Sequence, residues 1–327
     1  MNTLRDLILV TGSAGWIGRR VSCRLSEKGC LVVGYDMVGS TGPWIEVFEG
    51  ELALLGNPTP DLRRLLQKTK TVIHCAGRAH RPVETPEEVQ AFKEANVRGT
   101  QNLVNACLQN GVDRIVYVST IAGYDWKRAV GQPVSEDVLI KPVSAYAQTK
   151  LEGESIISKS SLDWRVIRLA TVFGEGDRAN FAKLARGLKR RQFLVPGDGD
   201  ARKSVIPVDV AVEVLVEMAL KTTPRYRLIN AAITDTPTLR EMCEAYSKYC
   251  GFPRPISLPM SVFKVLSAGG TVINRVINGF PLTLDTLGKL TTSTVIDNSR
   301  MLETLPDIPL PNFVEALARH ATFYKNI

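Results

Sequence analysis

The fold of this chain can be argued from one run of residues near its beginning, Leu7-Ile8-Leu9-Val10-Thr11-Gly12-Ser13-Ala14-Gly15-Trp16-Ile17-Gly18. An apolar, β-branched segment ends at Thr11, glycine then recurs at every third position, and a helical pattern follows. Glycines there allow a tight strand-to-helix turn and a close approach of the backbone to a pyrophosphate. The amino end of the helix offers N–H groups and a positive dipole to the phosphates. Because a strand and a helix flank the glycines, the motif predicts dinucleotide binding rather than an ordinary turn.

Strand-like and helix-like segments alternate through the first half of the chain. Continuous apolar runs such as Ile115-Val116-Tyr117-Val118 are typical of a parallel sheet covered on both faces. The alternation predicts an α/β fold, a Rossmann-type doubly wound parallel sheet over residues 1–170. We expect strands at 7–11, 30–35, 44–49, 70–76, 113–119 and 164–169, and helices at about 15–28, 59–67, 86–109 and 143–160.

The alternation of strand-like and helix-like segments ends at about residue 170, and prolines and short helical patterns dominate the rest of the chain. This change predicts a smaller, mostly helical substrate-binding region over residues 171–327, with some segments returning to the Rossmann domain. Ligands of such folds bind outside the carboxyl ends of the strands.

The bulk composition excludes several classes of protein. The longest charge-free stretch around the apolar C-terminal segment, Val265 to Asn274, is too short to span a bilayer. Asp6 interrupts the N-terminus, so no signal peptide is expected and the protein is predicted to be cytoplasmic. The six cysteines include no Cys-x-x-Cys pair and there are three histidines, which predicts reduced, mostly buried thiols and no metal site. The net charge is +8, but no aromatic residues are interleaved with the clustered basic residues, so no nucleic-acid partner is expected.

Asp36 ends the second predicted strand, Leu31-Val32-Val33-Gly34-Tyr35-Asp36. A carboxylate at this place accepts hydrogen bonds from the adenosine ribose and repels a 2′-phosphate, which favours NAD. Arg19 and Arg20 follow the third glycine and are suited to a 2′-phosphate, so NADP stays open.

A second constellation is Tyr146-Ala147-Gln148-Thr149-Lys150 on a predicted helix, where the spacing of four puts Tyr146 and Lys150 on one face. A tyrosine hydroxyl, with an ordinary pKa of about 10, carries protons poorly at neutral pH. We expect the Lys150 ammonium, together with a positive nicotinamide ring, to lower the pKa of Tyr146. Thr120 follows the predicted strand at 113–119, so its hydroxyl is expected at the carboxyl edge of the sheet, either beside the tyrosine or as a turn cap.

With these residues in place, the chain resembles the extended short-chain dehydrogenases/reductases of the NAD-dependent epimerase/dehydratase family. The matching pieces are Gly12, Gly15, Gly18, Asp36, His74-Cys75-Ala76-Gly77, Asn96-Val97-Arg98-Gly99-Thr100, Ser119-Thr120, Tyr146, Lys150, Arg168-Leu169-Ala170-Thr171-Val172-Phe173-Gly174 and Ser204-Val205-Ile206-Pro207-Val208-Asp209. The match is dense to about residue 210 and loose beyond it.

The resemblance implies hydride transfer between a nicotinamide and a secondary alcohol or ketone. The catalytic residues it implies are Thr120, Tyr146 and Lys150. Those implied for the cofactor are Gly12, Ala14, Gly15, Trp16, Ile17, Gly18, Asp36, Glu51, Leu52, Cys75, Ala76, Gly77, Asn96, Ser119, Tyr146, Lys150, Leu169 and Val172. Those implied for the substrate are Arg78, His80, Thr120, Thr171, Asn180 and Lys203. A homodimer through the long helices at 86–109 and 143–160 is also a family expectation.

Within the family, Ala79-His80-Arg81 and Pro142-Val143-Ser144-Ala145-Tyr146 are most similar to enzymes acting on nucleotide sugars, namely 4-keto reductases and 4-epimerases. Sugar dehydratases are less similar, since Ile121-Ala122 stands where they carry an acidic pair. Two departures are Thr171 in place of a common asparagine, and Lys203 in place of an arginine, which loses the bidentate fork.

Two alternatives to a nucleotide-sugar enzyme stay open. The apolar segment Pro259-Met260-Ser261-Val262-Phe263 is similar to that of hydroxysteroid and lipid dehydrogenases. It predicts the wall of an apolar pocket, a peripheral membrane contact or ordinary packing. A non-catalytic dinucleotide sensor is the third hypothesis, and it is disfavoured because such a sensor needs none of Thr120, Tyr146 and Lys150.

Overall fold

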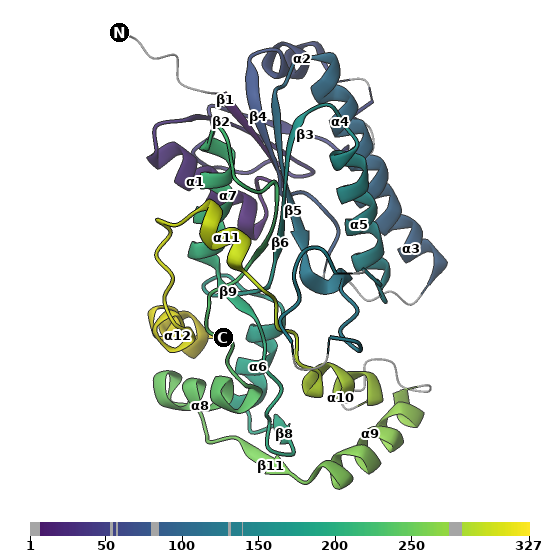
Figure 1. Cartoon of the computed structure of the whole chain (residues 1–327), viewed down its shortest axis with the longest axis vertical. Helices are drawn as coiled ribbons and strands as arrows, with labels where there is room; N and C mark the ends of the chain where they lie inside the picture. The colour runs from purple at the N-terminus through teal and green to yellow at the C-terminus, as the bar shows by residue number, and fades with distance from the viewer. Residues whose placement is uncertain are drawn as a thin grey trace.

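In the computed structural model, seven parallel strands form one sheet in the order β10-β6-β5-β4-β1-β2-β3 (Figure 1). Chain order reverses between the neighbours β1 and β4, as in a doubly wound fold. The predicted parallel sheet is confirmed, and the six expected strands lie within two residues of the observed bounds of β1 (Leu7–Thr11), β2 (Leu31–Asp36), β3 (Glu46–Glu49), β4 (Thr69–His74), β5 (Arg114–Thr120) and β6 (Asp163–Leu169). The seventh strand, β10 (Leu228–Ala231), was not expected. The structure describes residues 7–52, 55–56, 58–79, 85–129, 132–138, 140–274 and 283–327.

Helices cover both faces of this sheet, which explains its continuous apolar strands (Figure 1). On one face Val21 and Leu25 of α1 and Leu215 of α7 share a core with Val10 and Val116 of the strands. On the other face α2, α4 and α5 contribute to a second core, and α3 leads into α4. The bounds are α1 (Trp16–Glu27), α2 (Pro60–Leu66), α3 (Pro86–Lys93), α4 (Gly99–Gln109), α5 (Ala145–Ser158) and α7 (Val208–Leu220).

The helix expected over residues 86–109 is interrupted by a π-helical turn, η2 (Glu94–Arg98), between α3 and α4. Such turns are frequent at functional sites. Here the turn contains Asn96, whose side chain is buried.

The remainder of the chain is mostly helical, as predicted, and has an aromatic core around Phe173, Phe181, Tyr246, Phe313 and Tyr324. Two small parallel sheets, β7–β9 and β8–β11, were not predicted. β10 and α7 join the large sheet, while the division near residue 170 stays a prediction. The other elements are η3 (Ile121–Gly123), β7 (Thr171–Phe173), α6 (Asn180–Lys189), β8 (Leu194–Pro196), β9 (Val205–Pro207), α8 (Leu239–Cys250), β11 (Ile256–Leu258), α9 (Met260–Asn274), α10 (Leu284–Thr291), α11 (Ser299–Thr304), α12 (Phe313–Arg319) and α13 (Ala321–Lys325).

All six cysteines carry free thiols, three of them buried (Cys107, Cys243 and Cys250) and three partly exposed, fewer buried than the sequence argument expected. Among the described helices, none is long and apolar enough to cross a bilayer.

Candidate active site

The glycine turn lies at the carboxyl end of β1, against the loop that follows β4. Gly12 has a φ of +68°, and a Cβ on it would lie 2.7 Å from the backbone nitrogen of Ala76. A Cβ on Gly18 would overlap the carbonyl oxygen of Gly12, so α1 packs directly on the turn. Gly15, the N-cap of α1, is exposed and has no side chain that could cap the helix. The turn therefore offers the backbone approach that a pyrophosphate requires.

Asp36 ends β2, and its Oδ2 accepts a hydrogen bond of 2.9 Å from the Ala14 N–H in the glycine turn. The carboxylate is thus fixed beside the turn, where the sequence predicted it. Of the two arginines that left NADP open, Arg20 donates at 2.8 Å to the Glu175 carbonyl, which also accepts at 2.7 Å from the Trp16 indole. The Arg20 guanidinium is therefore hydrogen-bonded within the protein, while the Arg19 side chain is exposed.

A buried chain of hydrogen bonds lies beneath this region. Thr100 Oγ1 donates to the Asn96 carbonyl at 2.6 Å, which leaves it to accept from His74 Nε2 at 3.0 Å. His74 Nδ1 then accepts from Thr11 Oγ1 at 2.7 Å, and that oxygen accepts from the Ala76 N–H at 3.3 Å. Burial, with a smaller effect of the nearby Lys150 charge, lowers the pKa of His74 to about 3. The imidazole is a neutral structural link between β1, β4 and the turn η2.

Asn96 holds the loop after β4 against α5. Its Oδ1 accepts from the Arg78 N–H at 2.7 Å, and its Nδ2 donates to the Arg78 carbonyl at 3.1 Å and to Thr149 Oγ1 at 3.0 Å. The hydrogen bonds of the amide are thus made within the protein, where Asn96 shapes the loop after β4. A place near the cofactor stays what the resemblance implies.

Thr120 and Tyr146 meet at the carboxyl edge of β5. The Thr120 hydroxyl accepts from the Ala122 N–H at 3.1 Å, so it caps η3. It also hydrogen-bonds Tyr146, which lowers the pKa of that phenol, although burial outweighs this effect and the pKa is raised. The hydroxyl thus caps η3 and contacts Tyr146, while its catalytic role stays a prediction.

Lys150 lies one turn after Tyr146 and is 5% exposed. Its Nζ lies 3.9 Å from the centroid of the Tyr117 ring, and a Cβ on Gly77 would lie 3.8 Å from the same atom. Burial lowers the pKa of Lys150 to about 7, and the Glu154 carboxylate opposes this shift. In the protein alone, burial is the largest influence on the pKa of Tyr146 and raises it, and the lowering by Lys150 and a positive nicotinamide ring together stays a prediction.

Sequence reasoning missed the ion pair that fixes α5. Arg168 Nη2 lies 2.6 Å from Glu154 Oε2 and Nε lies 3.0 Å from Oε1, with both side chains buried. Ser119 Oγ donates to the same carboxylate, and the Arg168 guanidinium donates to Tyr124 Oη at 2.9 Å. The available signal was the position of Glu154 four residues after Lys150, on the same helical face.

Other residues predicted for the cofactor lie around this edge. Leu169 ends β6, Val172 lies in β7 and Glu51 and Leu52 follow β3. Cys75 follows β4, and burial raises the pKa of its thiol to about 12.

The residues predicted for the substrate are more dispersed. Thr171 begins β7 and Asn180 begins α6, where it is exposed. Lys203 Nζ donates to the carbonyls of Lys289, at 2.9 Å, and Thr292 at the end of α10. Its charge is thereby held at a helix C-terminus, and burial lowers its pKa to about 8. His80 lies outside the described residues.

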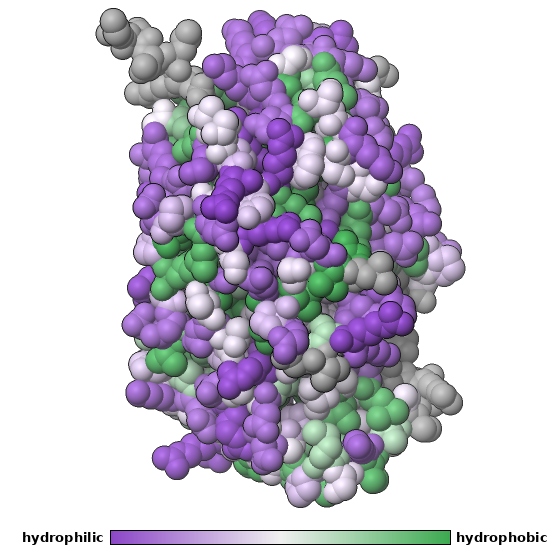
Figure 2. All heavy atoms as spheres, in the orientation of Figure 1, coloured by the Kyte–Doolittle hydropathy of each residue, from purple (hydrophilic) through white to green (hydrophobic). Residues whose placement is uncertain are grey.

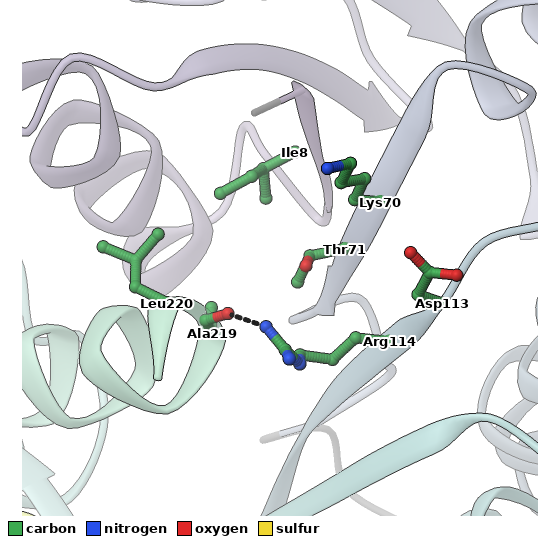
Figure 3. A pocket seen from close by; sticks show the side chains of 7 residues that line it. All are labelled: Ile8, Lys70, Thr71, Asp113, Arg114, Ala219 and Leu220. Atoms are coloured by element: carbon green, nitrogen blue, oxygen red, sulfur yellow. Dashed lines mark hydrogen bonds between the residues drawn. The ribbon is translucent and has the colours of Figure 1, made fainter. Parts of the chain in front are cut away.

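A small cavity of about 100 Å³ lies at the opposite, amino end of the strands (Figure 3). It is lined by Ile8 of β1, Thr71 of β4 and Arg114 of β5, and the Arg114 guanidinium donates at 2.9 Å to the Ala219 carbonyl. This cavity contains none of the predicted site residues and is too small for a dinucleotide.

A doubly wound sheet with a glycine turn at its reversal point, and a Tyr–Lys helix beside it, defines the class of Rossmann-fold dinucleotide-binding proteins. The family model for the NAD dependent epimerase/dehydratase family matches residues 8–232. The chain belongs to this family, which confirms the resemblance, the enzyme class and NAD as its cofactor.

Comparison with known proteins gives similarities at lower identity. The chain is 29% identical over 217 residues to the UDP-glucose 4-epimerase of Vibrio cholerae, covering 64% of this chain and 65% of that protein, less than two thirds of its length. It is 25% identical over 279 residues to the dTDP-4-dehydrorhamnose reductase of Mycobacterium tuberculosis, covering 80% and 85% of the two chains. The UDP-glucuronic acid 4-epimerase of Bacillus cereus, solved with UDP-glucuronic acid and NAD, superposes with a TM-score of 0.74 at 21% identity over 98% and 99% of the chains. This last likeness shows the fold.

Proposed function

We propose that the protein transfers hydride at a secondary alcohol or ketone of a nucleotide sugar, as a 4-epimerase or a 4-keto reductase. The observation that carries the proposal is the hydrogen bond between Tyr146 and Thr120, at the carboxyl end of β5, with Lys150 one helical turn after Tyr146 on α5. The similarity to enzymes of both kinds supports a nucleotide sugar as the substrate.

The residues around the glycine turn fit NAD. Gly12 and Gly18 have no room for a side chain, and the Asp36 carboxylate is fixed beside the turn, suited to ribose hydroxyls. NAD, when bound, supplies the hydride acceptor and donor. Asn96 shapes the loop after β4, and the Lys150 ammonium, beside Gly77, is placed to hold ribose hydroxyls.

In this mechanism Tyr146 carries the proton. In the reductive direction its hydroxyl protonates the oxygen of the ketone, and in the oxidative direction its phenolate removes the proton of the alcohol. Thr120 hydrogen-bonds the same phenol and orients it. The positive charge of Lys150, one helical turn away, favours the phenolate during turnover.

Elimination of water is not part of the proposal. After Thr120 the chain continues with Ile121, which is buried, and Ala122, and both lie in the turn η3. Neither side chain can act as an acid or a base at this position.

The decisive experiment measures turnover of nucleotide sugars by the Tyr146→Phe variant, with Tyr249→Phe as a matched control on the outer helix α8. We expect loss of activity in the first by at least about a hundredfold and none in the second. Unchanged turnover in Tyr146→Phe contradicts the assignment. Net oxidation of NADH by the native protein identifies a reductase, while interconversion of two sugars without net oxidation identifies an epimerase.

Calorimetric titration of the NAD-loaded protein with UDP, GDP and dTDP tests the substrate class. Selective binding of one of them supports a nucleotide sugar. Binding of none favours the alternative, a lipid or hydroxysteroid alcohol. We also propose a homodimer through the helices at 86–109 and 143–160, which are α3, α4 and α5, and sedimentation velocity tests the dimer.

A further inference from the structure

Helix α9 buries one narrow stripe and exposes aliphatic side chains beside it. Phe263, Ser267 and Gly270, spaced by four and three residues, are buried. Val262, Val265 and Leu266 are 42%, 74% and 44% exposed. A surface helix of a globular protein normally turns its polar face outward. The exposed side of α9 carries Val262, Val265 and Leu266 among the polar Ser261 and Lys264, so it is only partly polar, unlike the outer face expected of such a helix.

Two further aliphatic side chains are exposed on the neighbouring elements β11 and α10. Ile256 of β11 is 52% exposed and Leu284 of α10 is 49% exposed. α10 is tied to α9 by a hydrogen bond of 2.9 Å from the Leu284 N–H to Thr271 Oγ1. We call Val262, Val265, Leu266, Ile256 and Leu284 the α9 face. Figure 2 shows apolar residues gathered at the lower end of the molecule, where Figure 1 places α9.

The charge around this face is positive. Across the described residues 254–274, which contain β11 and α9, two side chains are basic, Arg254 and Lys264, and none is acidic. Asp285 of α10 pairs with Lys289 at 2.5 Å, and the exposed Lys264 projects from α9 itself between Phe263 and Val265. Aliphatic side chains interspersed with cations are typical of segments that lie in the interface of an anionic bilayer. A second copy of the chain would instead bring two positive faces together.

We propose that the α9 face docks the protein on the surface of a membrane containing anionic lipid. Val262, Val265 and Leu266 enter the interface, and Lys264 contacts the lipid phosphates. The contact is peripheral, since none of the described helices can span a bilayer. The proposal is independent of the proposed activity, which concerns the carboxyl edge of the large sheet.

Co-sedimentation of the full chain with vesicles tests this proposal. We expect binding to vesicles of phosphatidylcholine containing about one third phosphatidylglycerol, and much weaker binding to phosphatidylcholine alone. Val265→Asp and Leu266→Asp are expected to reduce binding by at least about tenfold, and Lys264→Ala severalfold with a weaker dependence on salt. Val314→Asp makes the same change at a 39% exposed valine on α12 and is expected to leave binding unchanged.

Thermal melting and NADH binding confirm that each variant is folded, so that a loss of vesicle binding is not a loss of structure. The proposal is overturned if the native protein ignores anionic vesicles, or if Val265→Asp and Val314→Asp bind equally. It is also overturned if Val265→Asp converts an oligomer to a monomer, since a protein partner would then cover the α9 face.

Discussion

At the residue scale, Lys150 is a cation placed where burial disfavours its charge. Below its pKa of about 7 the side chain is charged in the folded protein, next to the Tyr117 ring and close to Glu154. The unfolded chain holds that proton up to an ordinary pKa of about 10.4. Between these values the unfolded state binds more protons than the folded state, so this residue makes stability rise as the pH rises.

We therefore expect Lys150→Met to be more stable than the native protein at pH values below about 7, with the difference shrinking as the pH rises toward about 10. The variant is also expected to lose turnover, because no positive charge then favours the Tyr146 phenolate. Chemical denaturation at several pH values measures the first effect and steady-state kinetics the second. A pH-independent stability difference would contradict the burial of a charged Lys150.

Gly12 is the residue at which the backbone conformation and the proposed cofactor site coincide. Gly12→Ala places a Cβ 2.7 Å from the Ala76 nitrogen in a left-handed conformation, and we expect a loss of about 1–3 kcal/mol of stability together with weakened NADH binding. Gly29→Ala is the matched control, since Gly29 has a φ of +83° with nothing within 4 Å of the added atom. It is expected to be destabilised by about 1–2 kcal/mol and to bind NADH normally. Fluorescence titration with NADH separates the two, and equal binding by both would refute the crowding argument.

At the level of elements, the sequence predicted what local patterns encode. The apolar runs of β1, β2 and β5 and the spacing of Tyr146 and Lys150 on α5 are local features, and each lies in the element expected for it. The Asn96 contacts and the Glu154–Arg168 pair join residues of different segments, from 14 to 53 positions apart in the chain. No local period encodes such contacts. The turn η2 escaped prediction for the same reason, because burial of Asn96 against the loop after β4 fixes it.

The Glu154–Arg168 pair fastens α5 to β6. Arg168→Met leaves the Glu154 carboxylate buried without its cation, and we expect a loss of about 3–5 kcal/mol in urea unfolding. The double variant Glu154→Gln/Arg168→Met is expected to recover part of that loss, since no uncompensated charge stays behind. Arg64→Met makes the same substitution in an exposed pair with Asp61 and is expected to cost about 1 kcal/mol or less. A double variant less stable than Arg168→Met would contradict this account.

At the scale of the whole molecule, the large sheet is completed by segments from late in the chain. β10 pairs with β6 in register from Leu228↔Val166 to Ala231↔Leu169. Nine of the thirteen residues of α7 are buried. Its Glu213 pairs with Arg24 of α1 at 2.7 Å. The first sheet therefore depends on residues that follow position 170.

Because the sheet depends on later segments, a chain cut at the expected boundary near residue 170 should not fold. A fragment of residues 1–170 lacks α7, so Val10, Val116 and Ile167 lose their cover on one face of the sheet, and we expect it to aggregate or to lack fixed tertiary structure. A fragment of residues 1–235 retains α7 and β10 and is expected to regain a cooperative unfolding transition, although its surfaces toward α8 and α11 are uncovered. Near-ultraviolet circular dichroism and size-exclusion chromatography compare the two. A compact, cooperatively folded 1–170 fragment would show instead that residues 1–170 fold on their own and that α7 is not needed for their stability.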